Sequence, residues 1–278
     1  MSAVERFGPS FHRTFAFNRS AISALLSLAG RFEKEPGRRM TREVIRSETL
    51  LGSIYVEAMP RYAQASGLLD SDNRLAPLGR YVAAQDILLG RQETLWLVHY
   101  NLCKHGGIAP RFWGYLVEEV MHAGDELERD QISQMIRSVT ESQQAIKVSD
   151  QTAADAATVF LKTYSSSDSL GGLSLLQDLG NGRYLVLEHE APPPLVFAFV
   201  VADYWALNLN NTSSVWIDEF NKTGGPAQTL LMGQGQINHA MRELSRMGIA
   251  SVQLTQPPYQ FSPLWRDQDD LLERIYGT

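Results

Sequence analysis

The sequence has only one cysteine, Cys103, among its 278 residues. A single cysteine excludes an intramolecular disulfide and a zinc site built on a cysteine cluster. It suits the reducing cytoplasm, where protein thiols stay reduced. The N-terminal stretch MSAVERFGPSFHRTF carries charge early and lacks the apolar core of a signal peptide. We therefore expect a cytoplasmic protein.

Long apolar runs are also missing. A membrane helix needs roughly 18 to 20 uninterrupted apolar residues, and the strongest apolar stretch, residues 195–209, is shorter and contains Asp203. No membrane segment is expected. The composition, 44% hydrophobic and 20% charged, is that of an ordinary globular protein with enough apolar side chains for a core.

Positive charge is in short supply, because 31 acidic side chains outnumber 25 Lys and Arg and leave a formal net charge of −6. That balance excludes a protein that coats nucleic acid with its whole surface. The charge is uneven, however. Residues 1–46 hold nine basic and four acidic side chains, a net of +5, whereas residues 111–155 hold four and nine, a net of −5. A basic end permits local contact with phosphate, and two ordinary solvated faces are the alternative.

The usual signatures of catalysis and metal binding are absent. The six histidines include no pair at the helical i, i+4 spacing, and no HExxH occurs. The string GQGQIN (233–238) lacks the Lys-Ser/Thr of a phosphate-binding loop, and there is no GxSxG elbow. We therefore predict no catalytic residue, no metal and no cofactor, and expect that the protein is not an enzyme. A catalytic site assembled from distant residues stays open.

Helical spacing dominates the first 90 residues. Apolar periodicity predicts a helix over 19–32, a break at EPGRR (35–39), a short helix after Thr41 and a further helix over 50–65. The polar tetrad SDNR (71–74) then lies between two short apolar stretches. Helix, turn, second helix and hairpin is the order of a winged helix-turn-helix. An αα-hairpin followed by an unrelated β-hairpin would give a similar string.

The rest of the chain divides into three predicted parts. Residues 91–164 form a helical middle, and residues 165–231 combine a Ser- and Gly-rich linker with a strand and an apolar helix. Residues 232–278 read again as helix, hairpin and helix, with the hairpin turn at QPPY (256–259). With residues 1–90 as the first module, the predicted fold is mainly α with small β-hairpins (α+β) and has a winged helix-turn-helix near each end.

DNA contacts are predicted in the first module by role. Basic side chains before and on the short helix contact phosphates, the second helix enters a major groove, and the polar tetrad forms the wing tip. The candidates are Arg38, Arg39, Arg42 and Arg46 for phosphates, Ser53, Tyr55 and Arg61 for the groove, and Asn73 and Arg74 for the wing. Because the second helix also carries Glu57 and Pro60, a module that contacts only protein is the competing interpretation.

Several strings in residues 11–115 follow the pattern of a known family. They are FHRTFAF (11–17), LLGSIYVEAMPRYAQASGLL (50–69), LAPLG (75–79) and ETLWLVHYNL (93–102). In these strings the sequence resembles the bacterial family catalogued as domain of unknown function 4007. The matching positions are His12, Thr14, Phe15, Leu51, Gly52, Ala58, Met59, Arg61, Tyr62, Gly67, Leu68, Thr94, Leu95, Trp96, Leu97, His99 and Tyr100. Ala76 stands where the family usually has Thr, which removes a capping hydroxyl before the next helix.

The resemblance implies a genomic context but assigns no activity to the protein. Genes of this family lie in defence islands, often beside genes for phosphoadenosine-phosphosulfate-reductase-like proteins. Those neighbours are similar to sulfur-inserting enzymes of DNA phosphorothioation systems. The resemblance therefore implies phage defence or DNA modification, with this subunit handling DNA or organising partners.

These observations lead us to expect a non-enzymatic DNA-binding or adaptor subunit of a bacterial anti-phage or phosphorothioation-like DNA-modification system. Its expected partners are duplex DNA and the proteins of a defence or sulfur-modification complex, with no membrane partner and with a homo-oligomer as a further expectation. Two alternatives stay open. One is a protein-interaction scaffold without DNA affinity, and the other is an accessory component of a nuclease or sulfur-transfer enzyme.

Overall fold

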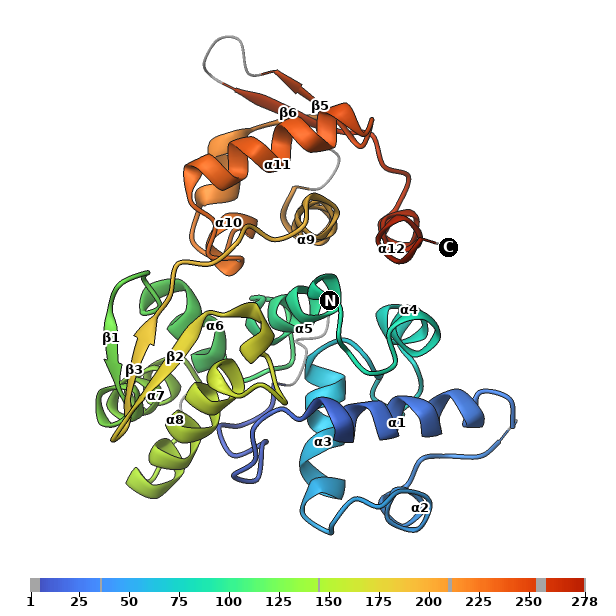
Figure 1. Cartoon of the computed structure of the whole chain (residues 1–278), viewed down its shortest axis with the longest axis vertical. Helices are drawn as coiled ribbons and strands as arrows, with labels where there is room; N and C mark the ends of the chain where they lie inside the picture. Colours follow the sequence, from blue (N-terminus) through green and yellow to red (C-terminus); the bar gives the residue numbers. More distant parts are fainter. Residues whose placement is uncertain (1–5, 36, 145, 210–211, 254–258, 278) are drawn as a thin grey trace. The chain divides into compact units, whose positions relative to one another are not determined.

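The computed structural model describes residues 6–35, 37–144, 146–209, 212–253 and 259–277 (Figure 1). The chain forms two compact units, Met1–His189 and Glu190–Thr278. Helices make up most of each unit, and each unit has a small three-stranded antiparallel sheet. The predicted fold class, mainly α with small β elements, is therefore confirmed. Among the helices of the described ranges, none has the length and apolar character needed to cross a membrane.

The first unit begins with four helices and continues with further helices and a sheet (Figure 1). Its elements are α1 (Arg19–Phe32), α2 (Arg42–Glu48), α3 (Tyr55–Ala65), α4 (Pro77–Gln85), α5 (Gln92–Cys103), α6 (Arg111–Glu119), β1 (Glu126–Glu128), α7 (Arg129–Gln144), α8 (Asp150–Ser165), η1 (Gly171–Leu173), β2 (Leu176–Gly180) and β3 (Arg183–Val186).

Helix α1 organises the N-terminal part of this unit. The Asn18 side chain accepts a hydrogen bond from the backbone N–H of Ala21 and so caps the first turn. The apolar face of α1, which includes Ile22 and Leu25, is buried, and the helix packs against α2, α3 and α4. Burial of this amphipathic face holds the helix in place.

The connection between α3 and α4 is a tight polar turn. The chain leaves α3 through Gly67, whose φ is +73°, a conformation that glycine adopts without steric cost. Leu69 and Leu75 then form one isolated antiparallel bridge. The predicted two-stranded hairpin is thus reduced to a single bridge around the tetrad 71–74.

An aromatic core joins the segments predicted as an N-terminal module and a helical middle. The Tyr62 ring of α3 lies 4.8 Å from Phe11 and 6.2 Å from Trp113 of α6, centroid to centroid. Trp113 in turn packs at 5.3 Å on Phe160 of α8, and its indole N–H donates a 3.0 Å hydrogen bond to the hydroxyl of Tyr164. These contacts place both segments in one compact unit.

The Ser- and Gly-rich segment at 165–174, predicted as part of a linker, is packed inside the first unit. Ser169, Leu170 and Leu173 are buried, and the backbone N–H of Leu170 donates to the carbonyl of Thr163 in α8. The Ser and Gly residues, which are typical of a flexible linker, here allow the backbone to turn closely on itself. At Gly171 an added Cβ would lie 2.4 Å from the carbonyl oxygen of Ser166.

The sheet of the first unit has the strand order β1-β3-β2. Strands β2 and β3 are joined at Asn181 and Gly182, whose φ angles are +55° and +76°. Two consecutive residues with positive φ are the signature of a type I′ turn. The string NGRYLVLEHE (181–190) predicts a hairpin turn that leads into a strand, and the structure confirms this turn.

The second unit combines helices with a sheet of order β4-β6-β5. Its elements are α9 (Pro194–Asn208), β4 (Val215–Trp216), η2 (Ile217–Asn221), α10 (Pro226–Thr229), α11 (Gln234–Arg246), β5 (Ala250–Gln253), β6 (Gln260–Pro263) and α12 (Gln268–Tyr276). Phe261 of β6 pairs with Val215 on one side and with Val252 on the other. The hairpin turn predicted at 256–259 lies outside the described residues except for Tyr259.

The core of the second unit lies among α9, α11 and the sheet. Phe220 packs edge-on against Phe197 of α9 and against Phe261 of β6, at 6.1 and 5.3 Å. Helix α11 buries Ile237 and Met241 and packs on α9 and β5. The apolar helix predicted over 195–209 is thus α9, and it forms part of this core.

Candidate nucleic-acid interface

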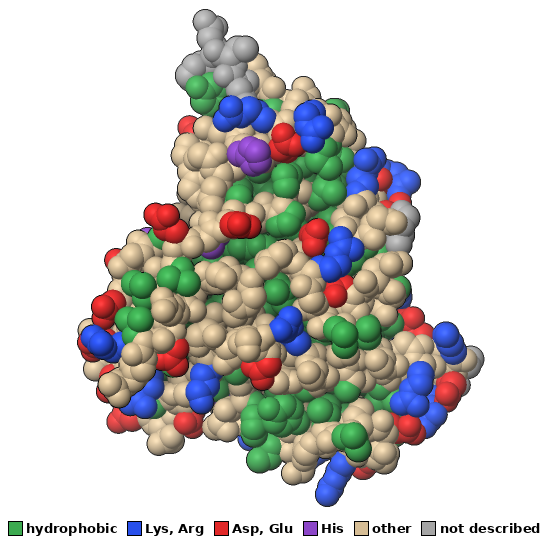
Figure 2. All heavy atoms as spheres, viewed as in Figure 1, with side chains coloured by type: hydrophobic (Ala, Val, Ile, Leu, Met, Phe, Trp, Pro, Cys, Tyr) green, Lys and Arg blue, Asp and Glu red, His purple; other side chains and the backbone are tan. Residues whose placement is uncertain are grey.

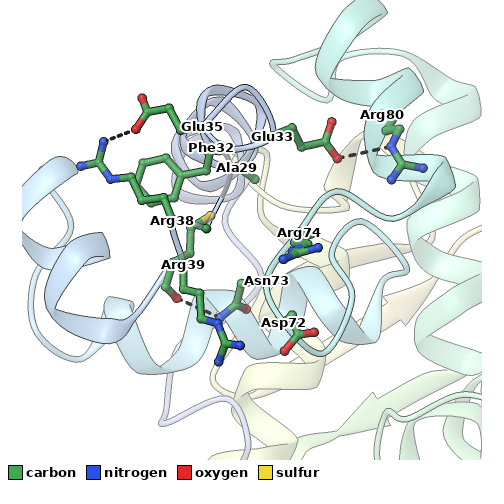
Figure 3. Close-up of a pocket in the computed structure, with 12 residues that line it drawn as sticks. Ala29, Phe32, Glu33, Glu35, Arg38, Arg39, Asp72, Asn73, Arg74 and Arg80 are labelled. Atoms are coloured by element: carbon green, nitrogen blue, oxygen red, sulfur yellow. Dashed lines mark hydrogen bonds and ion pairs between the residues drawn. The ribbon is translucent and has the colours of Figure 1, made fainter.

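A pocket of about 340 Å³ lies among the end of α1, the loop that leads to α2, the tetrad 71–74 and the first turn of α4 (Figure 3). We call this region the arginine pocket. Four arginines line it, together with three carboxylates and the amide of Asn73. Its charged lining residues are Glu33, Glu35, Arg38, Arg39, Asp72, Arg74 and Arg80.

Two of the four arginines are neutralised by neighbouring carboxylates. Arg38 donates to Glu35 at 2.7 Å and to Glu48 at 2.8 Å, and its guanidinium lies 4.3 Å from the centroid of the Phe32 ring. The hydrogen bond to Glu35 raises the pKa of Arg38, which stays charged. Arg80 pairs with Glu33 at 3.3 Å. Figure 2 shows basic and acidic side chains interspersed at the lower right, over the end of α1 and the following loop.

The other two arginines, Arg39 and Arg74, make no ion pair with any carboxylate in the ranges that the structure describes. Both are exposed, and both line the pocket. Figure 3 shows them on either side of Asn73. Two guanidinium groups that line one pocket without a described carboxylate partner are a suitable site for a phosphate oxygen.

The tetrad itself is rigidly held. The carboxylate of Asp70 accepts hydrogen bonds from the backbone N–H groups of Asp72 and Arg74, at 2.9 and 2.8 Å. Asn73 has a φ of +58°, and its side chain accepts from Gln64 of α3 and donates to the carbonyl of Met40. The predicted wing-tip residue Asn73 therefore positions the turn, and its amide is used inside the protein. Arg74, by contrast, is exposed and lines the arginine pocket.

Arg42 is also neutralised within the module. Its guanidinium pairs with the carboxylate of Glu57 on α3, and Arg13 approaches the other oxygen of the same carboxylate at 3.1 Å. Glu57 is the acidic side chain that weakened the DNA interpretation of α3 in the sequence. The structure places two arginines against it, so its negative charge is compensated.

Helix α3 offers little free surface. Most of its residues are buried, including Val56, Met59 and Tyr62. Tyr55, predicted to face a groove, is half-buried, and its ring lies 4.5 Å from Phe15. Ser53 is exposed in the turn before the helix, Arg61 is half-buried, and Arg46 is exposed on α2. None of these three lines the arginine pocket.

The turn between α2 and α3 is unexpectedly apolar at its surface. Leu50 is fully exposed, and Ile54 keeps 50% of its surface in solvent. An isolated exposed apolar side chain is ordinary, but two beside the start of a candidate recognition helix form a small apolar surface. We call Leu50 and Ile54 the apolar turn.

The nine predicted residues thus separate into groups. Arg38, Arg39, Asn73 and Arg74 lie together at the arginine pocket, and the other five do not line it. The sequence reasoning missed Arg80 and Asp72, which also line the pocket. Their signal was weak. Arg80 stands only three residues after the helix-starting Pro77, and Asp72 belongs to the polar tetrad, where acidic side chains are common in turns.

Comparisons with known proteins give a family and a fold. A family model described as "Protein of unknown function (DUF4007)" matches residues 48–258. A crystal structure described as "Magnesium ion-bound SspB crystal structure" is similar, with a TM-score of 0.77 and 15% identity over 96% of this chain and 87% of that one. A second, described as "SspB crystal structure", gives a TM-score of 0.77 and 16% identity over the same shares. At such low identity these likenesses show the fold alone. No curated protein matches the sequence.

Proposed function

This chain belongs to the DUF4007 family of proteins of unknown function, and from that premise we propose that it is a non-enzymatic subunit that binds duplex DNA in a bacterial anti-phage or DNA-modification system. The observation that carries the proposal is the pair of uncompensated guanidinium groups, Arg39 and Arg74, in the arginine pocket. The defence or modification context rests on the family resemblance of its sequence motifs.

The element order of the first unit supports the DNA proposal. Helices α1, α2 and α3, followed by the bridged turn and α4, follow the order of a winged helix-turn-helix. In this interpretation Arg74 lies on the wing and Arg39 precedes α2. Both arginines neutralise backbone phosphates, which fixes the protein on the duplex without reading its sequence. Arg38 and Arg42 have a smaller role than the sequence suggested, since carboxylates already occupy them.

Titration of a plain duplex across a salt series tests the proposal. We expect the binding constant to fall steeply with salt, because each phosphate contact releases condensed counterions. The double variant Arg39→Ala/Arg74→Ala should reduce the slope of log K against log salt by about two, close to one for each lost contact. The control is Arg137→Ala on α7. Arg137 already pairs with Glu141 and Asp150, so the loss of its charge should leave the salt dependence unchanged.

A protein-interaction module is the second candidate function, and the apolar turn favours it. Leu50 and Ile54 are exposed where a groove-reading helix would start, and α3 behind them is largely buried. If the chain shows no salt-sensitive shift of duplex DNA at low salt, the DNA proposal fails and this candidate replaces it. Leu50→Asp should then abolish binding of the partner protein from the native host and leave the fold unchanged.

The enzymatic alternative is an accessory component of a nuclease or sulfur-transfer enzyme. One structural neighbour is described as magnesium-bound. Within the described residues there is no group of three or more His, Cys, Asp or Glu side chains arranged to hold a metal ion. Incubation of supercoiled plasmid with the chain, with and without Mg²⁺, separates the proposals, because the binding subunit proposed here leaves the plasmid uncut.

A further inference from the structure

The second unit has an unassigned surface along α11. Gln234 and Arg242 are exposed on this helix, Asn238 is half-exposed between them, and the three lie four residues apart. Residues at this spacing share one face of a helix. On the face that Figure 2 shows, the surface over the N-terminal part of α11 is mostly tan, from backbone and uncharged polar groups.

Hydrogen bonds arrange these side chains in a continuous row. Asn221, at the end of η2, donates to the side chain of Gln234 at 3.4 Å, and Gln234 donates to the side-chain oxygen of Asn238 at 3.1 Å. Arg242 donates from Nε to the backbone carbonyl of Asn238 at 3.1 Å. We call Asn221, Gln234, Asn238 and Arg242 the amide row. The bonds fix the orientation of its members before any ligand arrives.

The order of helices and strands in the second unit suggests a role for the helix that carries this row. The order is helix α9, short strand β4, helices α10 and α11, and then strands β5 and β6, with β4 completing the sheet beside β6. This is the order of a complete winged helix, in which the helix before the hairpin enters the DNA major groove. In that comparison α11 is the recognition helix, and three of the four members of the amide row, Gln234, Asn238 and Arg242, lie along it.

From this geometry we infer that the amide row of α11 reads base edges in the major groove of duplex DNA, an inference that rests on the proposed DNA binding and assigns sequence recognition to the second unit. Asn and Gln side chains pair with the N6 and N7 atoms of adenine, and Arg pairs with O6 and N7 of guanine. The span from Gln234 to Arg242 is about 12 Å at 1.5 Å per residue. That length covers three to four base pairs at about 3.4 Å each.

The net charge of the second unit favours base reading over phosphate binding as the role of the amide row. Residues 190–278 contain five basic and nine acidic side chains, a net of −4, so the second unit is poorly suited to general attraction of DNA. On α11, however, the one carboxylate is Glu243, and it pairs with Arg246 at 2.7 Å. Arg242 makes no ion pair within the described part of the chain. The basic stretch and the arginine pocket of the first unit therefore supply salt-sensitive affinity, and α11 supplies discrimination among sequences.

Selection from a pool of duplexes with a randomised 20-base-pair centre tests the inference on the full chain. The wild type should enrich a core of three to four base pairs that contains both guanine and adenine. Asn238→Ala should relax an adenine position and Arg242→Ala a guanine position, each by about tenfold or more in preference. Arg242→Lys keeps the charge but loses the planar fork, so it should relax the same guanine position.

Arg274→Ala is the matched control, because it removes the same charge from α12 of the same unit, where Arg274 pairs with Asp270. It should leave the enriched core unchanged. Affinity of all variants for the unselected pool, and its dependence on salt, should stay within about twofold of the wild type. Salt-sensitive pool binding without an enriched core, or a core that Asn238→Ala and Arg242→Ala both preserve, overturns the inference and spares the proposed function. No binding of the pool at low salt overturns both.

Discussion

His12 is the residue whose burial most clearly makes the stability of the protein depend on pH. Its side chain is 1% exposed, and Nδ1 accepts a hydrogen bond from the backbone N–H of Thr14. Desolvation is the main cause that lowers the pKa of His12, to about 4 from its usual 6.5, although Asp155 opposes the shift. The imidazole is therefore neutral in the folded protein at neutral pH.

The sign of the effect on stability follows from linkage. Below pH 6.5 the unfolded chain binds a proton at His12, whereas the folded chain does not do so until about pH 4. The free energy of unfolding should therefore fall as the pH is lowered from 6.5 to 4. The difference between pKa values of 6.5 and about 4 corresponds to about 3 kcal/mol. Urea unfolding at a series of pH values measures this loss.

His12→Asn provides the comparison, because Asn Oδ1 can accept from Thr14 much as Nδ1 does and cannot titrate. The other titratable groups contribute equally to both proteins, so the difference between the two stability curves reports on His12 alone. The difference should change by about 3 kcal/mol across this range. Parallel curves between pH 6.5 and 4 would contradict the prediction.

At the scale of single residues, the sequence identifies the basic side chains that could contact phosphate. It does not show which of them are already paired with carboxylates. The basic stretch predicts Arg38 and Arg42 as phosphate contacts. In the structure Glu35 and Glu48 neutralise Arg38, and Glu57 neutralises Arg42. Glu48 stands ten residues beyond Arg38, and Glu57 fifteen beyond Arg42, and no local pattern links partners at such distances. Arg39 and Arg74 differ from them only in the folded structure, where no described carboxylate reaches them.

At the scale of elements, the first turn of α4 lies directly against Leu68, in the segment that leads from α3 into the tetrad. A Cβ added at Gly79 would lie 1.9 Å from the carbonyl oxygen of Leu68, and that same carbonyl accepts the backbone N–H of Ala76. Gly79→Ala should therefore push α4 away from the turn that presents Arg74. We expect a loss of about 1–3 kcal/mol in the free energy of unfolding, as for other overpacked sites.

Gly30→Ala in α1 is the matched control for this prediction. An added Cβ there meets only the Leu75 side chain, at an ordinary 3.8 Å, and Gly30 lies within a helix. Alanine should stabilise that helix by about 0.5–1 kcal/mol. Urea midpoints of the two variants should therefore move in opposite directions. A Gly79→Ala variant as stable as the wild type would show that α4 moves without cost.

Elements with strong periodicity could be predicted, and those set by long-range pairing could not. Helix α1 occupies the predicted residues 19–32, and α9 lies within one residue of its predicted bounds. Strand β4 has two residues, Val215 and Trp216, which is too short for any pattern. Because β4 carries no pattern in the sequence, its pairing with β6 could not be predicted, and nothing in the sequence links α9 to residues 232–278. The hydrogen bond from Asn221 to Gln234 joins side chains thirteen residues apart, so the amide row could not be predicted from the sequence either.

At the scale of the whole molecule, the two units differ in charge and have separate cores. The first unit has a net charge of −2 that includes the basic N-terminal stretch, and the second has a net charge of −4. In the first unit Phe160 packs on Trp113 and Tyr164, and in the second Phe220 packs on Phe197 and Phe261. All of these rings are largely or fully buried. Because each unit has its own buried aromatic core, we expect each unit to unfold as a separate cooperative transition.

Phe160→Ala and Phe220→Ala make this independence measurable, because each deletes one fully buried ring from one core. A Phe→Ala change in a core costs about 3–5 kcal/mol. Calorimetry of the wild type should resolve two transitions, and each variant should lower one of them. The shift should be larger for Phe220→Ala, at least about 10 °C, because a given loss of free energy moves the midpoint of a unit of 60–100 residues further than that of one twice its size. A single transition that both variants lower equally would mean that the cores unfold together, and base reading by α11 would then depend on the stability of the first unit.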